Sequence, residues 1–225
     1  TVTATDADLP AQTLTYSIAG GADAAHFTID ASSGALAFAV APNFEAPADA
    51  NADNVYVVLV QVSDGSLVDT QTLSVTVTNV NEPPLITSDG GGVTASVGAA
   101  ENQTAVTTVT SSDVDGAAPS YSIVGGADAA RFTIDAATGV LAFNAAPDFE
   151  SPSDAGADNV YDVTVQVADG NGGTATQVIA VTVSNVNEAP LITSAAAVSV
   201  AENQSGVVTV TSSDVDGGSP VYTIV

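Results

Sequence analysis

Side chains that carry oxygen ligands are concentrated in a short, proline-containing segment that occurs twice. Residues 79–84 read Asn-Val-Asn-Glu-Pro-Pro, and residues 185–190 read Asn-Val-Asn-Glu-Ala-Pro. Carboxylate and amide oxygens are the ligands of hard cations, and Ca²⁺ takes about 6–8 of them. Each segment follows an alternating apolar run and precedes the tetrapeptide Leu-Ile-Thr-Ser, so that one strand ends before it and another begins after it. The two segments are therefore predicted to be cation-binding linkers between β domains.

Further acidic motifs recur along the chain. They are Glu-Asn-Gln at residues 101–103 and 202–204, Asp-Val-Asp at 113–115 and 214–216, and Asp-Phe-Glu at 148–150 with its weaker copy Asn-Phe-Glu at 43–45. A single Asp-Val-Asp-Gly is equally compatible with an ordinary Asx turn, and repetition of the motif does not exclude that alternative. The several motif types occur together and in a fixed order, which favours a cation site.

The charge balance limits the classes of function. The chain has 26 acidic residues against one arginine, Arg131, and no lysine, which gives a formal charge of −25. Nucleic-acid binding and polybasic contact with a membrane surface both need Lys and Arg, so neither is expected. Repulsion between so many carboxylates destabilises a compact state unless counter-ions bind. We therefore expect bound cations.

Residue types needed for other chemistry are missing. The chain has no Cys and one histidine, His26, so ordinary zinc and iron–sulfur sites cannot be assembled. His26 and Arg131 occupy equivalent repeat positions, which argues against a catalytic role for either, and we predict that the protein is not an enzyme. No apolar run approaches the roughly 20 residues that span a bilayer, so direct membrane insertion is not expected.

Self-comparison shows a tandem array. Tyr-Ser-Ile at residue 16 and Phe-Thr-Ile-Asp at residue 27 each return 105 residues later, and the linker returns after 106. A period near one hundred residues indicates repeated domains. We predict a first repeat over residues 1–80 that lacks its first strand, a complete repeat over 85–186 and the start of a third over 191–225, joined by linkers 79–84 and 185–190. We expect the chain to be a segment of a longer array.

The complete repeat has the strand spacing of a β-sandwich. Seven strands are predicted, at residues 93–97, 106–111, 120–124, 132–134, 140–143, 161–167 and 177–183. Residues 134–140 are predicted to form a hairpin with Gly139 at a position of positive φ, and Asp128 is expected to cap a single helical turn. The predicted fold class is all-β, with tandem Greek-key, immunoglobulin-like or cadherin-like sandwiches.

These motifs resemble those of cadherin repeats, and more specifically the cadherin-like repeats of large bacterial surface adhesins. The resemblance covers essentially the whole chain. It rests on the early Glu-Asn, the Asp-Phe-Glu, the Asn-Val-Asn-Glu linker, the Asp-x-Asp pairs (including Asp6 and Asp8) and the late Asp-Gly at residues 64 and 169. The linker departs from the family pattern because Asn replaces its first Asp, Glu replaces its second, and Pro83 or Ala189 replaces its final Asn. These changes lower the charge of the site and leave the number of ions open.

The resemblance implies two Ca²⁺ clusters. The first would collect Asn43, Glu45, Asn79, Asn81, Glu82, Asp113, Asp115 and Asp169. The second would collect Glu101, Asp148, Glu150, Asn185, Asn187, Glu188, Asp214 and Asp216. Residues 49–54 and 154–159, in a loop that cadherin repeats typically lack, are predicted to be turn formers, with an additional cation site as the alternative.

The function implied by the resemblance is mechanical. We expect a calcium-rigidified stalk or adhesin segment outside the cell or on its surface, which supports cell-surface, cell–cell or biofilm adhesion. Its partners would be Ca²⁺ and the neighbouring repeats of the same chain. Two alternatives stay open: a subunit or shaft of a surface filament, with homophilic contacts through incomplete modules, and a polysaccharide-binding module.

Overall fold

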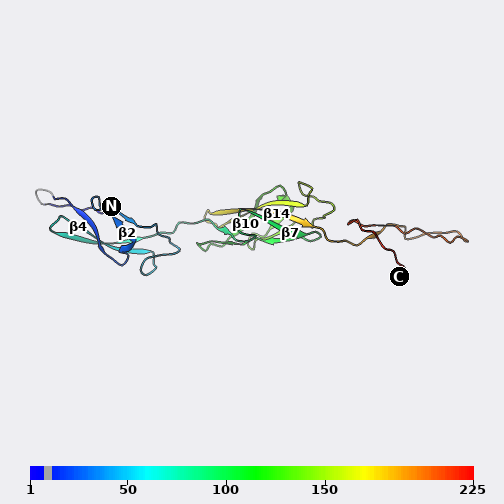
Figure 1. Cartoon of the computed structure of the whole chain (residues 1–225), viewed down its shortest axis with the longest axis horizontal. Coiled ribbons are helices and arrows are strands. Elements are labelled where there is room, and N and C mark those ends of the chain that lie inside the picture. Colours follow the sequence, from blue (N-terminus) through cyan, green and yellow to red (C-terminus); the bar gives the residue numbers. More distant parts are fainter. Residues whose placement is uncertain (8–11) are drawn as a thin grey trace. The chain divides into compact units, whose positions relative to one another are not determined.

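The structure, a computed structural model, describes residues 1–7 and 12–225 (Figure 1). It divides into two compact units, Thr1–Asn81 and Glu82–Val225. Asp8, one member of the first Asp-x-Asp pair, lies outside the described residues. In the described part of the chain, no helix is long and apolar enough to cross a membrane.

Unit 1 contains a three-stranded antiparallel sheet and a hairpin. The sheet has the order β1 (Thr15–Gly20), β4 (Val55–Ser63), β5 (Val68–Thr76). The hairpin pairs β2 (Phe27–Ile29) with β3 (Leu36–Phe38), after the short 3₁₀ turn η1 (Ala24–His26). Phe27, Tyr56, Val58 and Val60 form its buried core.

In unit 2, a four-stranded and a three-stranded sheet face each other across a buried core. The larger sheet has the order β10 (Ser120–Gly125), β13 (Val160–Ala168), β14 (Thr174–Ser184), β7 (Thr94–Ala100), and only the β14–β7 pair is parallel. The smaller sheet has the order β11 (Phe132–Ile134), β12 (Val140–Phe143), β8 (Ala105–Thr108), and η2 (Ala129–Arg131) precedes β11. The all-β sandwich prediction is confirmed.

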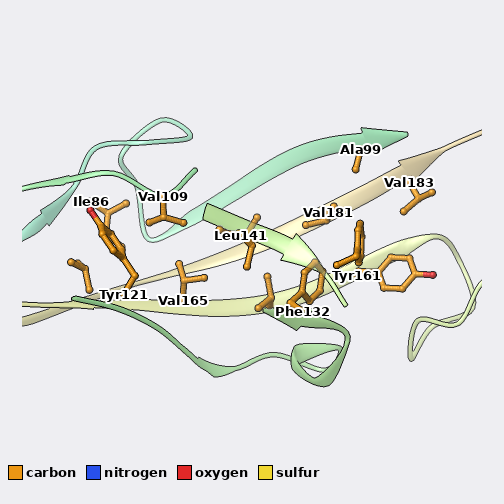
Figure 2. Close-up of a cluster of buried hydrophobic side chains, with 14 residues drawn as sticks. Ile86, Ala99, Val109, Tyr121, Phe132, Leu141, Tyr161, Val165, Val181 and Val183 are labelled. Atoms are coloured by element: carbon orange, nitrogen blue, oxygen red, sulfur yellow. The ribbon is translucent and has the colours of Figure 1, made fainter. Parts of the chain in front are cut away.

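The core lies between these two sheets. Along β13, Tyr161, Val163, Val165 and Val167 are buried and alternate with half-buried neighbours, as the sequence pattern predicts. Figure 2 shows the labelled side chains of both sheets, among them Leu141 and Val181, gathered in the space between the strands. This apolar layer fixes the register of β13 and β14, because a slip of one residue would turn the buried side chains outward.

One predicted strand is divided in two. Residues 106–111 form the end of β8 and then, after two residues outside the ladder, β9 (Ser111–Ser112), which pairs with β6 (Leu85–Ile86). Val109, between them, is fully buried and its amide donates to the carbonyl of Gly139. The chain therefore leaves one sheet and joins another strand at a residue that packs into the core.

The predicted hairpin at residues 134–140 is present. Asp135 Oδ1 accepts hydrogen bonds from the amides of Ala137 and Thr138, and Gly139 has φ of 71°. A Cβ on Gly139 would lie 2.1 Å from the carbonyl oxygen of Val109. Glycine is therefore required at this position both by backbone conformation and by the close approach of Val109.

The expected single helical turn is present as η2, with Asp128 at its N-cap position, but the expectation that the side chain of Asp128 caps it is wrong. Asp128 precedes η2, but its side chain makes no capping hydrogen bond there. Instead its carboxylate accepts hydrogen bonds from the amides of Ala155 and Asp162, at 2.7 and 2.9 Å. Asp128 is buried and ties the loop before β13 to the strand itself, because its carboxylate accepts from one amide of each.

The last 35 residues contain little regular structure. Within residues 191–225, the strands are β15 (Leu191–Ile192) and β16 (Ser212–Ser213), which pair with each other. Apart from the half-buried Ser194, the residues between them, including the counterpart of β7 at 195–201, are exposed, and all of them lie outside any strand. The boundaries predicted for the three repeats stay predictions.

Candidate cation-binding site

The first carboxylate of the site is fixed by the end of the β7–β14 pair. Glu101 directly follows β7, and its amide donates to the carbonyl of Ser184 at the end of β14. Its side chain is only 3% exposed, and its two carboxylate oxygens accept hydrogen bonds from the amides of Phe149 and Val186, both at 2.7 Å. Glu101 therefore joins three segments: the end of β7, the Asp-Phe-Glu motif and the linker.

Asp148 and Glu150 flank Phe149 and so lie beside Glu101. One ligand atom from each of Glu101, Asp148 and Glu150 can be chosen so that all three lie within 4.8 Å of one another. Asp148 Oδ1 also accepts a hydrogen bond from the amide of Ser151. Three carboxylates at this separation form a potential cation site.

The linker adds a second carboxylate group that shares Glu150. One ligand atom from each of Glu150, Glu188 and Asp216 again lies within 4.8 Å of the others. The amide of Glu188 donates to Asp216 Oδ2 at 2.6 Å, and the amide of Asp216 donates to Asp214 Oδ1 at 3.1 Å. The Asp-Val-Asp turn is thereby held against the linker, and Glu150 connects the two carboxylate groups.

Amide side chains complete the surroundings. Asn185 Nδ2 donates to Glu150 Oε1 at 2.5 Å, and Asn187 Nδ2 donates to the carbonyl of Glu188. Asn102 Nδ2 donates to Glu188 Oε1, although the two residues are 86 positions apart. The sequence analysis did not include Asn102 among the ligands, and its adjacency to Glu101 was the signal that pointed to it.

The carboxylates of the site repel one another. The pKa of Glu150 is raised by partial burial and by the charges of Glu101, Glu188 and Asp216. The pKa of Glu188 is raised by burial and by the charges of Glu101 and Asp216, although the hydrogen bond from Asn102 acts in the opposite direction. Asp216 differs, because the amide of Glu188 and the side chain of Asn185 hold its pKa below the ordinary value.

Two carboxylate oxygens of the site are shielded from solvent without a hydrogen bond. They are Glu188 Oε2 and Asp216 Oδ1. A buried anionic oxygen without a partner is costly, and a cation is the usual partner. The chain has no lysine and a single arginine, so side-chain cations cannot neutralise the group. An all-oxygen set of carboxylates and amides fits Ca²⁺ and does not fit metals that select nitrogen or sulfur.

The eight residues of the second predicted cluster differ in how closely they are brought together. Glu101, Asp148, Glu150, Glu188 and Asp216 belong to the two carboxylate groups. Asn185, Asn187 and Asp214 join them through the hydrogen bonds described above. The role of all eight as metal ligands stays a prediction.

The residues of the first predicted cluster are divided between the two units. Asn43, Glu45, Asn79 and Asn81 lie in unit 1, and Glu82, Asp113, Asp115 and Asp169 lie in unit 2. Within unit 2, the amide of Glu82 donates to Asp115 Oδ2 at 2.8 Å, and the amide of Asp115 donates to Asp113 Oδ1 at 2.9 Å. This arrangement repeats the contacts of Glu188, Asp214 and Asp216. The first cluster also stays a prediction.

The acid-rich loop at residues 149–159 is organised by its own backbone. Asp154 accepts hydrogen bonds from the amides of Asp158 and Asn159, and Asp49 makes the equivalent bonds in unit 1. Burial alone would raise the pKa of Asp154, but these amides outweigh it and lower the pKa. The prediction that these acids form turns is confirmed.

Comparison with known proteins finds a similarity between the middle of the chain and one domain family. Residues 94–184 match the model of the Cadherin domain family. Human protocadherin Fat 1 is 31% identical over 185 residues, which is 78% of this chain but 4% of that protein. The chain therefore spans a very small share of this relative.

The fold is also that of solved cadherin structures. Human CDH23 EC21–23 superposes with a TM-score of 0.57 at 18% identity, covering 92% of this chain and 70% of that one. Mouse cadherin-23 EC22–24 gives a TM-score of 0.54 at 20% identity, covering 95% of this chain and 69% of that one. These similarities show a cadherin-like sandwich fold.

Proposed function

We propose that this chain is a calcium-rigidified segment of an extracellular adhesion protein, built from successive cadherin-type modules. The observation that carries the proposal is the pair of carboxylate groups joined through Glu150, with two solvent-shielded oxygens that have no hydrogen-bond donor. The family match of residues 94–184 supports the adhesive and extracellular part of the proposal. In this role the protein is a mechanical element and not an enzyme.

The candidate ligands come from three parts of unit 2. Glu101, Asp148 and Glu150 belong to the body of the complete repeat, Glu188 belongs to the linker, and Asp216 belongs to the segment after it. Bound Ca²⁺ would neutralise the repulsion among these carboxylates. With the repulsion neutralised, two hydrogen bonds hold the linker in one conformation. The linker amide of Val186 donates to Glu101, and the linker amide of Glu188 donates to Asp216. A linker held from both ends is stiff.

The first predicted cluster would repeat this arrangement at residues 79–84. Its support is the copy of the Glu82–Asp115–Asp113 hydrogen bonds within unit 2. An array with several such linkers would act as an extended spacer in cell-surface or cell–cell adhesion, including adhesion in a bacterial biofilm. Because metal binding contributes to the free energy of the folded linker, its stiffness would depend on the calcium concentration.

Calcium titration of the 225-residue chain tests the proposal. Binding heats and protection of residues 185–190 from proteolysis should both appear with Ca²⁺ and disappear with chelator. Glu188→Gln should weaken binding at the second cluster, whereas Asp69→Asn, on an exposed position of β5, should not, although it removes a formal charge of the same size. Equal cleavage of the linker with calcium and with chelator would overturn the proposal.

A further inference from the structure

A small pocket occurs in each unit at equivalent positions of the repeat. Its volume is about 130 Å³ in unit 2 and about 170 Å³ in unit 1. At a shift of 105 residues the two linings correspond, so that Phe143, Pro147 and Tyr161 of unit 2 take the places of Phe38, Pro42 and Tyr56 of unit 1. Because two separate units form it from the same residue types, the pocket is a property of the repeat.

The pocket of unit 2 has a buried apolar floor. Phe143 and Tyr161 are 3% and 1% exposed, and Pro147 is also buried. The rings of Phe143 and Tyr161 meet edge to face, with their centroids 5.1 Å apart. The amide of Ser153 donates to the Tyr161 hydroxyl at 3.2 Å, which brings the acid-rich loop to one side of the pocket. The floor is therefore held by the core, and one wall is supplied by the loop.

Both basic side chains of the protein lie at this pocket. Arg131 is the only arginine of the chain, His26 is the only histidine, and there is no lysine. Arg131 lines the pocket of unit 2, and His26 lines the pocket of unit 1. The basic side chains of a chain with 26 acidic residues are thus placed at one position of the repeat, beside a cavity.

The guanidinium of Arg131 is available to a ligand. The backbone of Arg131 is fixed, because its amide donates to the carbonyl of Asp128 and its carbonyl accepts from the amide of Asn144, both at 2.8 Å. Its side chain is exposed, and no carboxylate of the described residues forms an ion pair with it. The nearby carboxylate of Asp128 accepts instead from the amides of Ala155 and Asp162. A guanidinium in this position favours an anionic ligand.

We propose that the pocket of unit 2 binds a sugar ring that carries a carboxylate, as in a uronic acid unit of a polysaccharide. Its volume is close to that of an engineered cavity of about 150 Å³ that holds benzene, so one six-membered ring fits. The planar guanidinium of Arg131 matches a carboxylate with two parallel hydrogen bonds. The exposed side chains of Ser153 and Asn144 lie at the rim, where they meet ring hydroxyls, while the apolar floor meets a C–H face of the ring.

The pocket of unit 1 lacks two of these features. His26 replaces Arg131, and Ala48 replaces Ser153. The ring of His26 packs edge-on against Tyr56, with the centroids 5.6 Å apart. An imidazole has no planar fork of donors, and Ala48 has no hydroxyl, so the pocket of unit 1 should bind the same sugar acid more weakly.

The formal charge of −25 opposes an anionic ligand mainly at long range. At physiological ionic strength the Debye length is about 8 Å, so distant carboxylates are largely screened, whereas a guanidinium in contact with the ligand is not. The pocket of unit 2 shares no residue with the predicted second calcium cluster. The sugar-acid site and the proposed function can therefore fail separately.

An NMR titration of the 225-residue chain with D-glucuronate tests the proposal. It is done at physiological ionic strength and in chelator, which excludes binding through a calcium bridge. The backbone amide signals of Asn144 and Ser153 should shift and saturate with a Kd on the order of 1 mM, as expected for a ligand of one ring. D-Glucose lacks the carboxylate and benzoate lacks the hydroxyls, and each should bind at least tenfold more weakly.

Variants separate the pocket from a general charge effect. Arg131→Gln should weaken glucuronate binding at least tenfold, and Arg131→Lys, which keeps the charge but not the fork, should lie between. Ala146→Leu, at the wall of the pocket, should abolish the shifts although Arg131 is intact. His26→Gln, at the equivalent position of unit 1, is the matched control and should leave the unit 2 titration unchanged. Thermal unfolding verifies that each variant is folded.

Three results would overturn the proposal. They are unchanged binding by Arg131→Gln, full binding by a folded Ala146→Leu chain, and an affinity for D-glucose or benzoate that equals the affinity for D-glucuronate. The first would exclude recognition of the carboxylate by Arg131, the second would place the ligand outside the pocket, and the third would exclude a sugar acid as its ligand.

Discussion

Two neighbouring regions of unit 2 are rich in acids. One is the loop around Asp154, to which the buried Asp128 is hydrogen-bonded, and the other is the carboxylate cluster that contains Glu150 and Glu188. The carboxylates of the two regions have different partners. Asp154 and Asp128 are buried, and backbone amides donate to both of their carboxylate oxygens. Glu150 and Glu188 instead face other carboxylates, and Glu188 Oε2 has no donor. An acid whose oxygens are met by amides and that faces no other carboxylate is a structural group, whereas acids that face one another need a cation. Glu101 belongs to the second kind, although amides donate to both of its oxygens. The predictions below test this distinction.

The largest effect should come from the structural acids. Asp128→Ala would leave the amides of Ala155 and Asp162 without their acceptor in a buried position. Loss of two hydrogen bonds to a charged group should lower the free energy of unfolding of unit 2 by about 3 kcal/mol. Chemical denaturation followed by circular dichroism measures this. The loss should be the same with calcium and with chelator, and a loss seen only with calcium would place Asp128 in the cation site.

Removal of calcium should have the next largest effect. A ligand that binds only the folded state at one hundred times its Kd stabilises that state by about 2.7 kcal/mol. Thermal unfolding with calcium and with chelator should differ accordingly, and the difference should grow with the logarithm of the calcium concentration. A denaturation midpoint that does not respond to calcium would mean that the cluster is only a solvated acidic surface.

Substitution within the cluster should have opposite effects with and without metal. Glu188→Gln removes one of three facing charges, so it should stabilise the metal-free protein and weaken calcium binding by about tenfold, because affinity depends on the number of charged ligands. Asp158→Asn in the adjacent loop is the matched control and should leave the affinity unchanged. Destabilisation of the metal-free protein by Glu188→Gln would contradict the repulsion inferred here.

The smallest effect should be a dependence of metal-free stability on pH. The pKa values of Glu150 and Glu188 are raised in the folded state, chiefly by burial and then by neighbouring carboxylates. The folded state therefore binds more protons than the unfolded state, and these two groups lower stability as the pH rises above their ordinary value of 4.5.

Asp154 has the opposite sign. Its folded pKa is lowered, so its contribution to the free energy of unfolding is present above its unfolded pKa and is lost as the pH falls through the folded pKa.

Stability curves of the Glu150→Gln, Glu188→Gln double variant and of the unmodified chain, both in chelator, should separate most at neutral pH and converge near pH 4. Saturating calcium should remove the dependence that comes from the two glutamates.

Much of the fold could be predicted because its signals are local. The alternation of apolar residues at 161–167 and the hairpin at 134–140 need only neighbours in sequence, and both are present in the structure. The division of residues 106–111 into two strands could not be predicted, because it depends on the packing of Val109 against Gly139, thirty residues away. The ends of the strands likewise depend on partners in space.

The candidate site could likewise be predicted only in part from the sequence. Its acids were found from repeated motifs, and the structure brings Glu101, Asp148, Glu150, Glu188 and Asp216 together. The contact of Asn102 with Glu188 and the role of Asp128 as an acceptor of distant amides were not found. Each contact depends on the distance between segments far apart in sequence. The position of Asn102 beside Glu101 was a signal for the first contact, whereas no motif indicated the second.

The sequence by itself determined the charge, the repeated motifs, the alternation and the identity of the candidate oxygen ligands, because each is a property of residue type and spacing. Only the tertiary structure decided which acids are neutralised by amides and which face one another. It also decided that Asp128 accepts hydrogen bonds from the amides of Ala155 and Asp162. The physical reason is that hydrogen-bond geometry and burial depend on where the strands end in space. The same residue types, Asp and Glu, occur both among the acids that accept from amides and among those that face one another.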